Sequence, residues 1–159
     1  MSKDVDFTYN IEPVWDAVKE IRDKVESLLA TVKKELSYAS KMVTSELIEN
    51  AIKYGSAVDS AKTKGIGFEF SVSDNQIRIK VTNRIISEKD YENVKTHIRI
   101  INETNNPKEI YVQRLAQLME NPKIGESQLG LYRIAYEGEF DLQYEFADGV
   151  LTIIATRSF

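Results

Sequence analysis

Two pairs of segments in which apolar and polar residues alternate constrain the fold of this sequence more than any other feature. The two segments of each pair are joined by a short turn. In each segment large apolar side chains occupy every second position. The segments are residues 65–73, 76–83, 139–146 and 150–157. The turns are Ser73-Asp74-Asn75 and Ala147-Asp148-Gly149. Because period-two alternation around a short turn is typical of paired strands, the sequence predicts two antiparallel hairpins.

Helical periodicity fills most of the remaining chain. Apolar residues recur three and four positions apart in the predicted helices, residues 13–31, 34–54, 87–103, 107–120 and 129–137. Apolar and polar residues alternate over residues 4–10, which predicts a first strand. Gly55 suits the end of a helix, and residues 56–64 are predicted as a loop. This order favours the α/β class, as an α+β two-layer sandwich. Its mixed, mostly antiparallel sheet carries helices on one face, and its other face is expected to be solvated or to form a homodimer surface.

Composition narrows the class of protein. The 159 residues suit a single domain over 1–159, and the chain contains no cysteine, which excludes disulfides and thiolate chemistry. A net charge of −4 and a pI near 5.2 argue against nucleic acid as the partner. The start lacks the apolar stretch of a signal peptide, and no apolar run reaches about 18 residues, so a cytoplasmic protein without a membrane span is expected.

A stripe of three polar residues follows the buried seam of the helix predicted over 34–54. With about 100° per residue and Leu47 at the centre of the seam, Asn50, Glu46 and Lys53 lie at roughly −60°, −100° and −120°. They therefore share one edge of the helix, at the border between core and solvent. A charged edge of this kind is often only a solvated surface. It is also where a pocket beside the helix would lie.

The segment Glu46-Leu47-Ile48-Glu49-Asn50-Ala51-Ile52-Lys53-Tyr54 resembles the N-box of the GHKL ATPase superfamily, whose pattern is E-x-x-x-N-A-x-K-[YH]. This resemblance implies a histidine-kinase-like ATPase fold that binds ATP with Mg²⁺. It implies that Asn50 is a Mg²⁺ ligand, that Glu46 is the general base or positions it, and that Lys53 lies near phosphate oxygens. Phosphoryl transfer requires such oxygen ligands and positive charge.

Two later segments resemble other parts of the same family. Residues 125–137 resemble its second glycine box, with Gly130 and Leu131 in place and Ser127-Gln128 where an earlier glycine belongs. A helix N-terminus at this point would hold phosphate. Residues 148–157 resemble the closing strand, in which Thr152 would approach the nucleotide.

The family's first glycine box, D-x-G-x-G, is not matched. Asn83 occupies the position of its aspartate, and no glycine follows. The alternation places Asn83 on the apolar face of its strand. Its amide could accept a hydrogen bond from the amino group of adenine, or it could end the strand as a turn residue. This departure, the helical insert and the segment from Ser127 to Glu137 resemble small stand-alone GHKL proteins of the SiaB type.

The resemblance leaves two functions open. The single histidine, His97, lies after the N-box, so the chain cannot be an ordinary self-phosphorylating histidine kinase. A protein serine/threonine kinase of the anti-sigma-factor or partner-switching type is expected, with a small regulatory protein as substrate. Its ATP would lie between residues 34–54 and the sheet. The alternative is a degenerate GHKL domain without catalysis that binds and sequesters such a partner.

Overall fold

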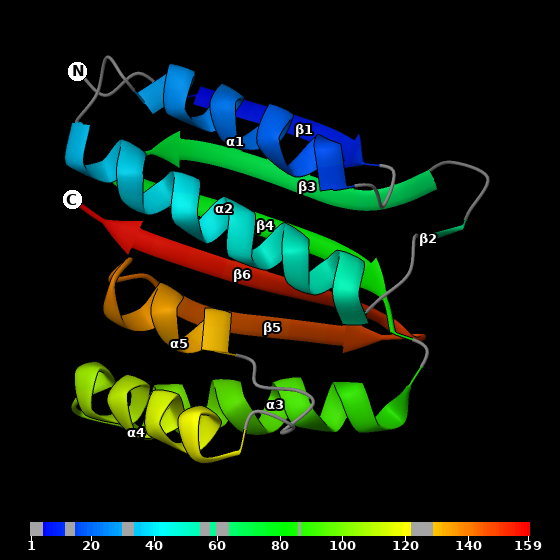
Figure 1. The fold of residues 1–159 in the computed structure, drawn as a ribbon. Coiled ribbons are helices and arrows are strands. Elements are labelled where there is room, and N and C mark those ends of the chain that lie inside the picture. The colour runs from blue at the N-terminus through cyan, green and yellow to red at the C-terminus, as the bar shows by residue number, and fades with distance from the viewer. Residues whose placement is uncertain are drawn as a thin grey trace.

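The computed structural model describes residues 5–11, 15–29, 34–54, 58–59, 64–85, 87–121 and 129–159. The helices are α1 (Trp15–Leu29), α2 (Lys34–Tyr54), α3 (Glu88–Glu103), α4 (Pro107–Glu120) and α5 (Leu129–Tyr136) (Figure 1). The strands are β1 (Val5–Ile11), β2 (Val58–Asp59), β3 (Lys64–Ser73), β4 (Gln76–Arg84), β5 (Asp141–Ala147) and β6 (Val150–Ser158). The predicted helix over 34–54 is confirmed to the residue. The predicted positions at Gly55 and Ser127-Gln128, and most of the loop over 56–64, lie outside the described residues.

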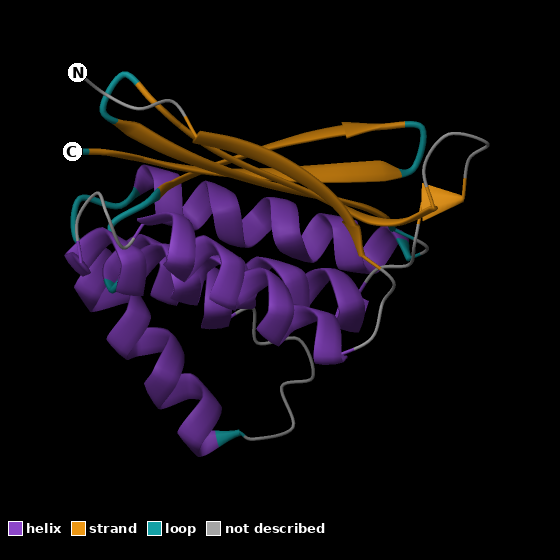
Figure 2. Ribbon diagram, turned by 90° about the horizontal axis from the view of Figure 1, so that it is seen from above, coloured by secondary structure: helices purple, strands orange, loops and turns teal. Residues whose placement is uncertain are grey.

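The main sheet runs in the order β1-β3-β4-β6-β5, with the two-residue β2 beside β3. Every strand pairing in the described ranges is antiparallel. Figure 2 shows the helices together on one face of the sheet, while no described helix lies on the other face, here called the uncovered face. The predicted α+β class, with a mostly antiparallel sheet and helices on one face, is therefore confirmed.

Both hairpins turn where the sequence predicts. Asp74 and Asn75 have φ values of 49° and 60°, and Asp148 and Gly149 have φ values of 53° and 78°. Two consecutive residues with positive φ form the turn whose twist matches that of the flanking strands. Asn, Asp and Gly tolerate this conformation best, which is why these turns could be recognised in the sequence.

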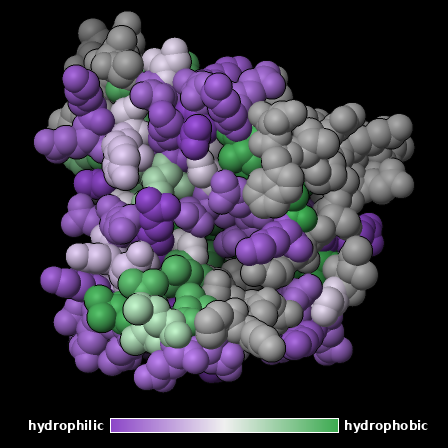
Figure 3. Space-filling view, viewed as in Figure 1, coloured by the Kyte–Doolittle hydropathy of each residue, from purple (hydrophilic) through white to green (hydrophobic). Residues whose placement is uncertain are grey.

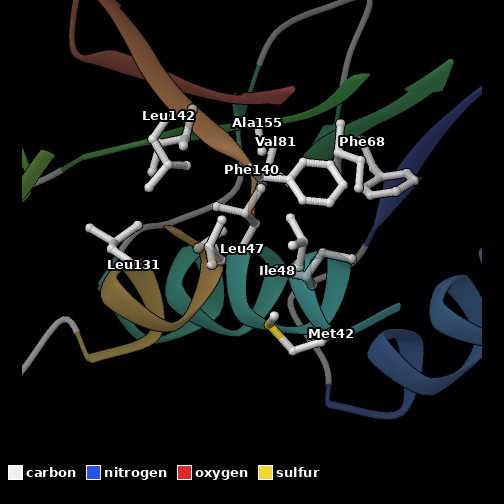
Figure 4. Packing of buried hydrophobic residues seen from close by; sticks show 14 of the residues in the cluster. Met42, Leu47, Ile48, Phe68, Val81, Leu131, Phe140, Leu142 and Ala155 are labelled. Atoms are coloured by element: carbon white, nitrogen blue, oxygen red, sulfur yellow. The ribbon is translucent and has the colours of Figure 1, made fainter. Parts of the chain in front are cut away.

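The core fills the layer between the helices and the sheet. Figure 4 shows Leu47, Leu131 and Phe140 in this layer, together with residues of the central strands. On β4 the side chains that face the helices are those of Ile77, Ile79, Val81 and Asn83, each 5% exposed or less. The intervening side chains, such as that of Thr82, lie on the uncovered face. This alternation decides which polar residues can reach α2.

His97, the single histidine, is a core residue that joins two helices. Its side chain on α3 is 7% exposed, and its Nδ1 forms a hydrogen bond with the hydroxyl of Tyr132 on α5. Burial lowers the pKa of His97 from 6.5 to about 4, and the positive charge of Arg114 contributes to this change. The histidine is therefore neutral in the folded protein above about pH 4.

This buried histidine should make the fold less stable in mild acid. Between pH 6.5 and about 4 the unfolded chain binds a proton at His97 that the folded chain does not, so the free energy of unfolding falls as the pH falls. The expected loss between pH 7 and pH 5 is about 2 kcal/mol. Urea unfolding at both pH values measures it. In the His97→Gln variant, the free energy of unfolding should no longer fall in this way between pH 7 and pH 5. If the variant loses as much stability as the unchanged chain, the loss belongs to the carboxylates and not to His97.

Candidate functional site

The polar stripe predicted on α2 lies at the border between core and solvent, as the helical wheel requires. The side chain of Glu46 is 19% exposed, Asn50 is half-buried, and Lys53 is exposed. Leu47 and Ala51, on the adjoining face, are buried against the sheet. The three predicted site residues therefore follow one edge of α2, with Glu46 and Asn50 closer to the core than Lys53.

The first turn of α5 packs directly against Glu46. Gly130 is the second residue of this helix, and a Cβ atom added there would collide with Oε2 of Glu46 and lie 3.1 Å from its Cδ. Any other residue at position 130 would require the carboxylate of Glu46 to move from its observed position. The structure thus brings together Glu46 and Gly130, which are predicted site residues 84 positions apart in the sequence.

Arg133, one turn further along α5, holds the same carboxylate. Its Nη1 donates a hydrogen bond to Oε1 of Glu46 at 2.9 Å, and its Nε donates to Oε2 of Glu137 at 2.6 Å. The hydrogen bond to Glu137, and then that to Glu46, raise the pKa of Arg133 above its ordinary value. This guanidinium is a fixed positive charge at the junction of α2 and α5.

A pocket of about 270 Å³ opens on the side of α2 that faces away from the sheet. Its lining comes from α1, α2 and α5 and consists of Arg22, Tyr38, Lys41, Met42, Ser45, Glu46, Glu49 and Arg133. Burial, followed by the negative charge of Glu46, raises the pKa of Glu49, while Arg22, Lys53 and Arg133 oppose this change. Nε of Arg22 and Oγ of Ser45 are buried without a hydrogen-bond partner. The lining of the pocket therefore contains a carboxyl group that holds a proton more readily, and two buried polar atoms without a hydrogen-bond partner among the described residues.

Asn50 has an amide that fits the predicted ligand role. Its Oδ1 is the kind of oxygen ligand that Mg²⁺ prefers, and its Nδ2 is buried with no hydrogen-bond partner among the described residues. In the ranges that the structure describes, no three His, Asp or Glu side chains are grouped to hold a metal ion. Mg²⁺ that arrives with a nucleotide needs only one or two protein oxygens, because phosphates and waters supply the others. The residues at the α2–α5 junction are compatible with that arrangement.

Asn83 faces the helices, as predicted, and is 5% exposed. Its Nδ2 donates a hydrogen bond to the carbonyl oxygen of Arg84 at 3.2 Å, which agrees with the strand-end role that the sequence left open. Where the family has glycines, β4 continues through Arg84 to the buried Ile85, whose N–H donates to the carbonyl oxygen of Gly149. The part of the predicted site that would bind the adenine base thus differs from the GHKL pattern more than the part that would bind the phosphates does.

Two predicted site residues do not join this group. Thr152 pairs with Thr82 across β4 and β6, and their hydroxyls lie 3.1 Å apart on the uncovered face of the sheet. Thr152 thus lies on the opposite face of the sheet from α2, and its approach to a nucleotide stays a prediction that this placement does not support. Leu131 is fully buried in the hydrophobic cluster, so its side chain fixes α5 in place and does not face a ligand.

Sequence reasoning missed Arg133, Glu49 and Arg22. Arg133 and Glu137 are visible in the sequence as a pair four residues apart on a helix, which was a usable signal. The contact between Arg133 and Glu46 joins residues 87 positions apart and depends on how α5 packs against α2. Arg22 reaches the pocket only because α1 lies beside α2.

Comparison with known proteins identifies the fold. Neither a family model nor a curated protein matches the sequence. A chain in the crystal structure of the SiaB–SiaC complex from Pseudomonas aeruginosa superimposes with a TM-score of 0.67 and 15% identity, over 96% of this chain and 88% of that chain. At this identity the likeness establishes a shared fold. Within the described residues, none of the helices has the length and apolar character needed to span a bilayer.

Proposed function

We propose that this chain is a Mg²⁺- and ATP-dependent protein kinase that phosphorylates a serine or threonine of a small regulatory partner protein. The observation that carries the proposal is the contact between Glu46 on α2 and Gly130 on α5, with Asn50 one turn beyond Glu46 on the same edge of α2. A carboxylate, an amide oxygen and a glycine in the first turn of a helix are suited to proton transfer, metal binding and phosphate binding respectively.

In this proposal each residue has a separate task. Asn50 would hold Mg²⁺, which neutralises phosphate charge, and the N-terminus of α5 at Gly130 would face the phosphates. The hydroxyl oxygen of the partner would form a bond to the terminal phosphorus of ATP, the bond from that phosphorus to the bridging oxygen would break, and ADP would leave. Glu46 would accept the hydroxyl proton. Lys53 would contribute positive charge from the next turn of α2.

The position of the pocket supports a second reactant at Glu46. On the helical wheel Glu46 lies about 40° from Asn50 on one side and about 60° from Glu49 on the other. Glu49 lines the pocket and Asn50 carries the proposed metal contact, so Glu46 stands between the two. A general base with the phosphates on one side and an open pocket on the other is placed to receive a proton from a hydroxyl group that enters through the pocket.

Binding of a partner without catalysis is the second candidate, and the exposed face of α4 favours it. Val112, Leu115 and Met119 follow one another at helical spacing and are 51%, 38% and 78% exposed. Figure 3 shows hydrophobic side chains gathered where α4 and α5 lie in Figure 1. The missing glycines after Asn83 agree with this candidate as well, since a sequestering module needs no nucleotide.

Titration with ATP and Mg²⁺ separates the two candidates. At 100 times its dissociation constant, a ligand of the folded state stabilises a one-site protein by about 2.7 kcal/mol, which should raise the melting temperature by roughly 5 to 10 °C. Asn50→Ala should abolish the Mg²⁺-dependent part of this shift, because the metal loses its amide ligand. Thermal melting with ATP, with and without Mg²⁺, is the measurement.

Asn102→Ala is the matched control for this titration. Asn102 lies on α3 and donates a hydrogen bond to the carbonyl oxygen of Leu142, so its loss changes stability without touching the α2–α5 junction. The ATP shift should survive in this variant. If the unchanged chain shows no shift at millimolar ATP, the kinase proposal fails and the binding candidate stands.

A further inference from the structure

Both oxygens of the Glu46 carboxylate are engaged by α5. Oε1 accepts the hydrogen bond from Nη1 of Arg133, and Oε2 lies against Gly130. The side chain of Glu46 is 19% exposed and that of Arg133 is 36% exposed, so this ion pair is only partly open to solvent. In the nucleotide-free protein, Oε1 of Glu46 is therefore already occupied by Arg133.

The guanidinium that holds Glu46 is suited to bind another anion. Its planar set of N–H donors matches the geometry of a phosphate as well as that of a carboxylate. Arg133 also belongs to the helix whose N-terminus would face the phosphates, three residues beyond Gly130. Glu137 holds its Nε at 2.6 Å, which fixes the guanidinium while Nη1 bonds Glu46.

We infer that Arg133 is a phosphate-binding residue that exchanges partners, bonding Glu46 in the nucleotide-free protein and the terminal phosphate of ATP in the complex. The inference rests on the proposed function and assigns to it a residue outside the N-box and the glycine box. The exchange releases Glu46 when a transferable phosphate is present. ADP has no terminal phosphate to offer, so with ADP the pair of Arg133 and Glu46 stays closed.

The ratio of ATP affinity to ADP affinity tests this exchange. Calorimetric titrations with Mg²⁺-ATP and Mg²⁺-ADP measure both constants. Loss of a charge-assisted hydrogen bond to phosphate in Arg133→Gln should weaken ATP binding by about 10- to 100-fold. The affinity for ADP should change by about twofold or less, since ADP does not use this contact. Arg157→Gln is the control, because Arg157 bonds the carbonyl oxygen of Gly138 and the carboxylate of Glu139, away from Glu46.

A double variant removes a second explanation. In Arg133→Gln the carboxylate of Glu46 loses its cation and would itself repel the terminal phosphate. Arg133→Gln combined with Glu46→Gln eliminates that repulsion. If Arg133 binds the phosphate, the double variant still lacks the preference for ATP.

Two outcomes would overturn the inference while leaving the proposed function intact. One is an Arg133→Gln protein with the same ratio of ATP to ADP affinity as the unchanged chain. The other is recovery of that ratio in the double variant, which would mean that Arg133 only neutralises Glu46. If the unchanged chain binds no Mg²⁺-ATP, the proposed function fails and the inference fails with it.

Discussion

Replacing Glu46 with glutamine should lower the rate of phosphoryl transfer by about 10²- to 10⁴-fold, while Mg²⁺-ATP binding remains close to that of the unchanged chain. Glutamine keeps the shape of the side chain, and its amide oxygen can still accept the hydrogen bond from Arg133. It cannot accept the proton of an attacking hydroxyl or water. Single-turnover hydrolysis of ATP, and transfer to the partner protein, measure the loss.

Glu137→Gln is the matched control for this prediction. Glu137 is the other carboxylate bonded to Arg133, and it is an exposed residue that directly follows the end of α5. Its loss removes an ion pair of similar length from the same guanidinium, so it reproduces the electrostatic change without removing the proposed base. Equal rates in the two variants would show that Glu46 acts only through Arg133 and is not the base.

Truncating Phe68 to alanine should destabilise the fold by about 3 to 5 kcal/mol and lower the melting temperature by on the order of 10 °C. Phe68 lies on β3, faces the helices and is 0% exposed, and its ring centre lies 5.5 Å from that of Phe7. Strands on both sides hold β3 in place, so the surroundings cannot close over the lost ring (Figure 4). Chemical unfolding measures the change.

Phe146→Ala removes the same ring from a more open place. Phe146 is 38% exposed on β5 and stacks on Tyr91 with ring centres 3.9 Å apart. Its loss should cost about 1 kcal/mol, since much of the ring already contacts water and the stacking energy is small. Similar losses in the two variants would contradict the placement of Phe68 at the centre of the core.

Much of the fold could be predicted because local rules and packing agree in this chain. The helix over 34–54 shows a continuous apolar seam, and both hairpins carry turn residues that accept positive φ values. The same reasoning correctly placed Asn83 on the helix-facing side of its strand. The strand order could not be obtained in this way, because alternation identifies a face of a strand but not its neighbour in the sheet.

The sequence places candidate site residues relative to one another where they share one helix, but it does not reveal contacts between helices. The spacing of Glu46 and Asn50 alone places them on one edge of α2. Thr152 was assigned from a motif, although it alternates with the apolar Leu151 and Ile153, and this parity already indicated the opposite face. Arg133 enters the site only through the packing of α5 on α2, which no spacing within either helix reveals.

The position of β6 between β4 and β5 has a consequence for biosynthesis. β6 leaves the ribosome after every other strand of this sheet, yet it is the strand to which both β4 and β5 pair. Until it emerges, β4 has an open edge and β5 has no partner in the sheet. Open edges can pair with other chains, and contacts between distant segments form slowly. Until β6 inserts between β4 and β5, the nascent chain therefore offers the open edge of β4 to neighbouring chains.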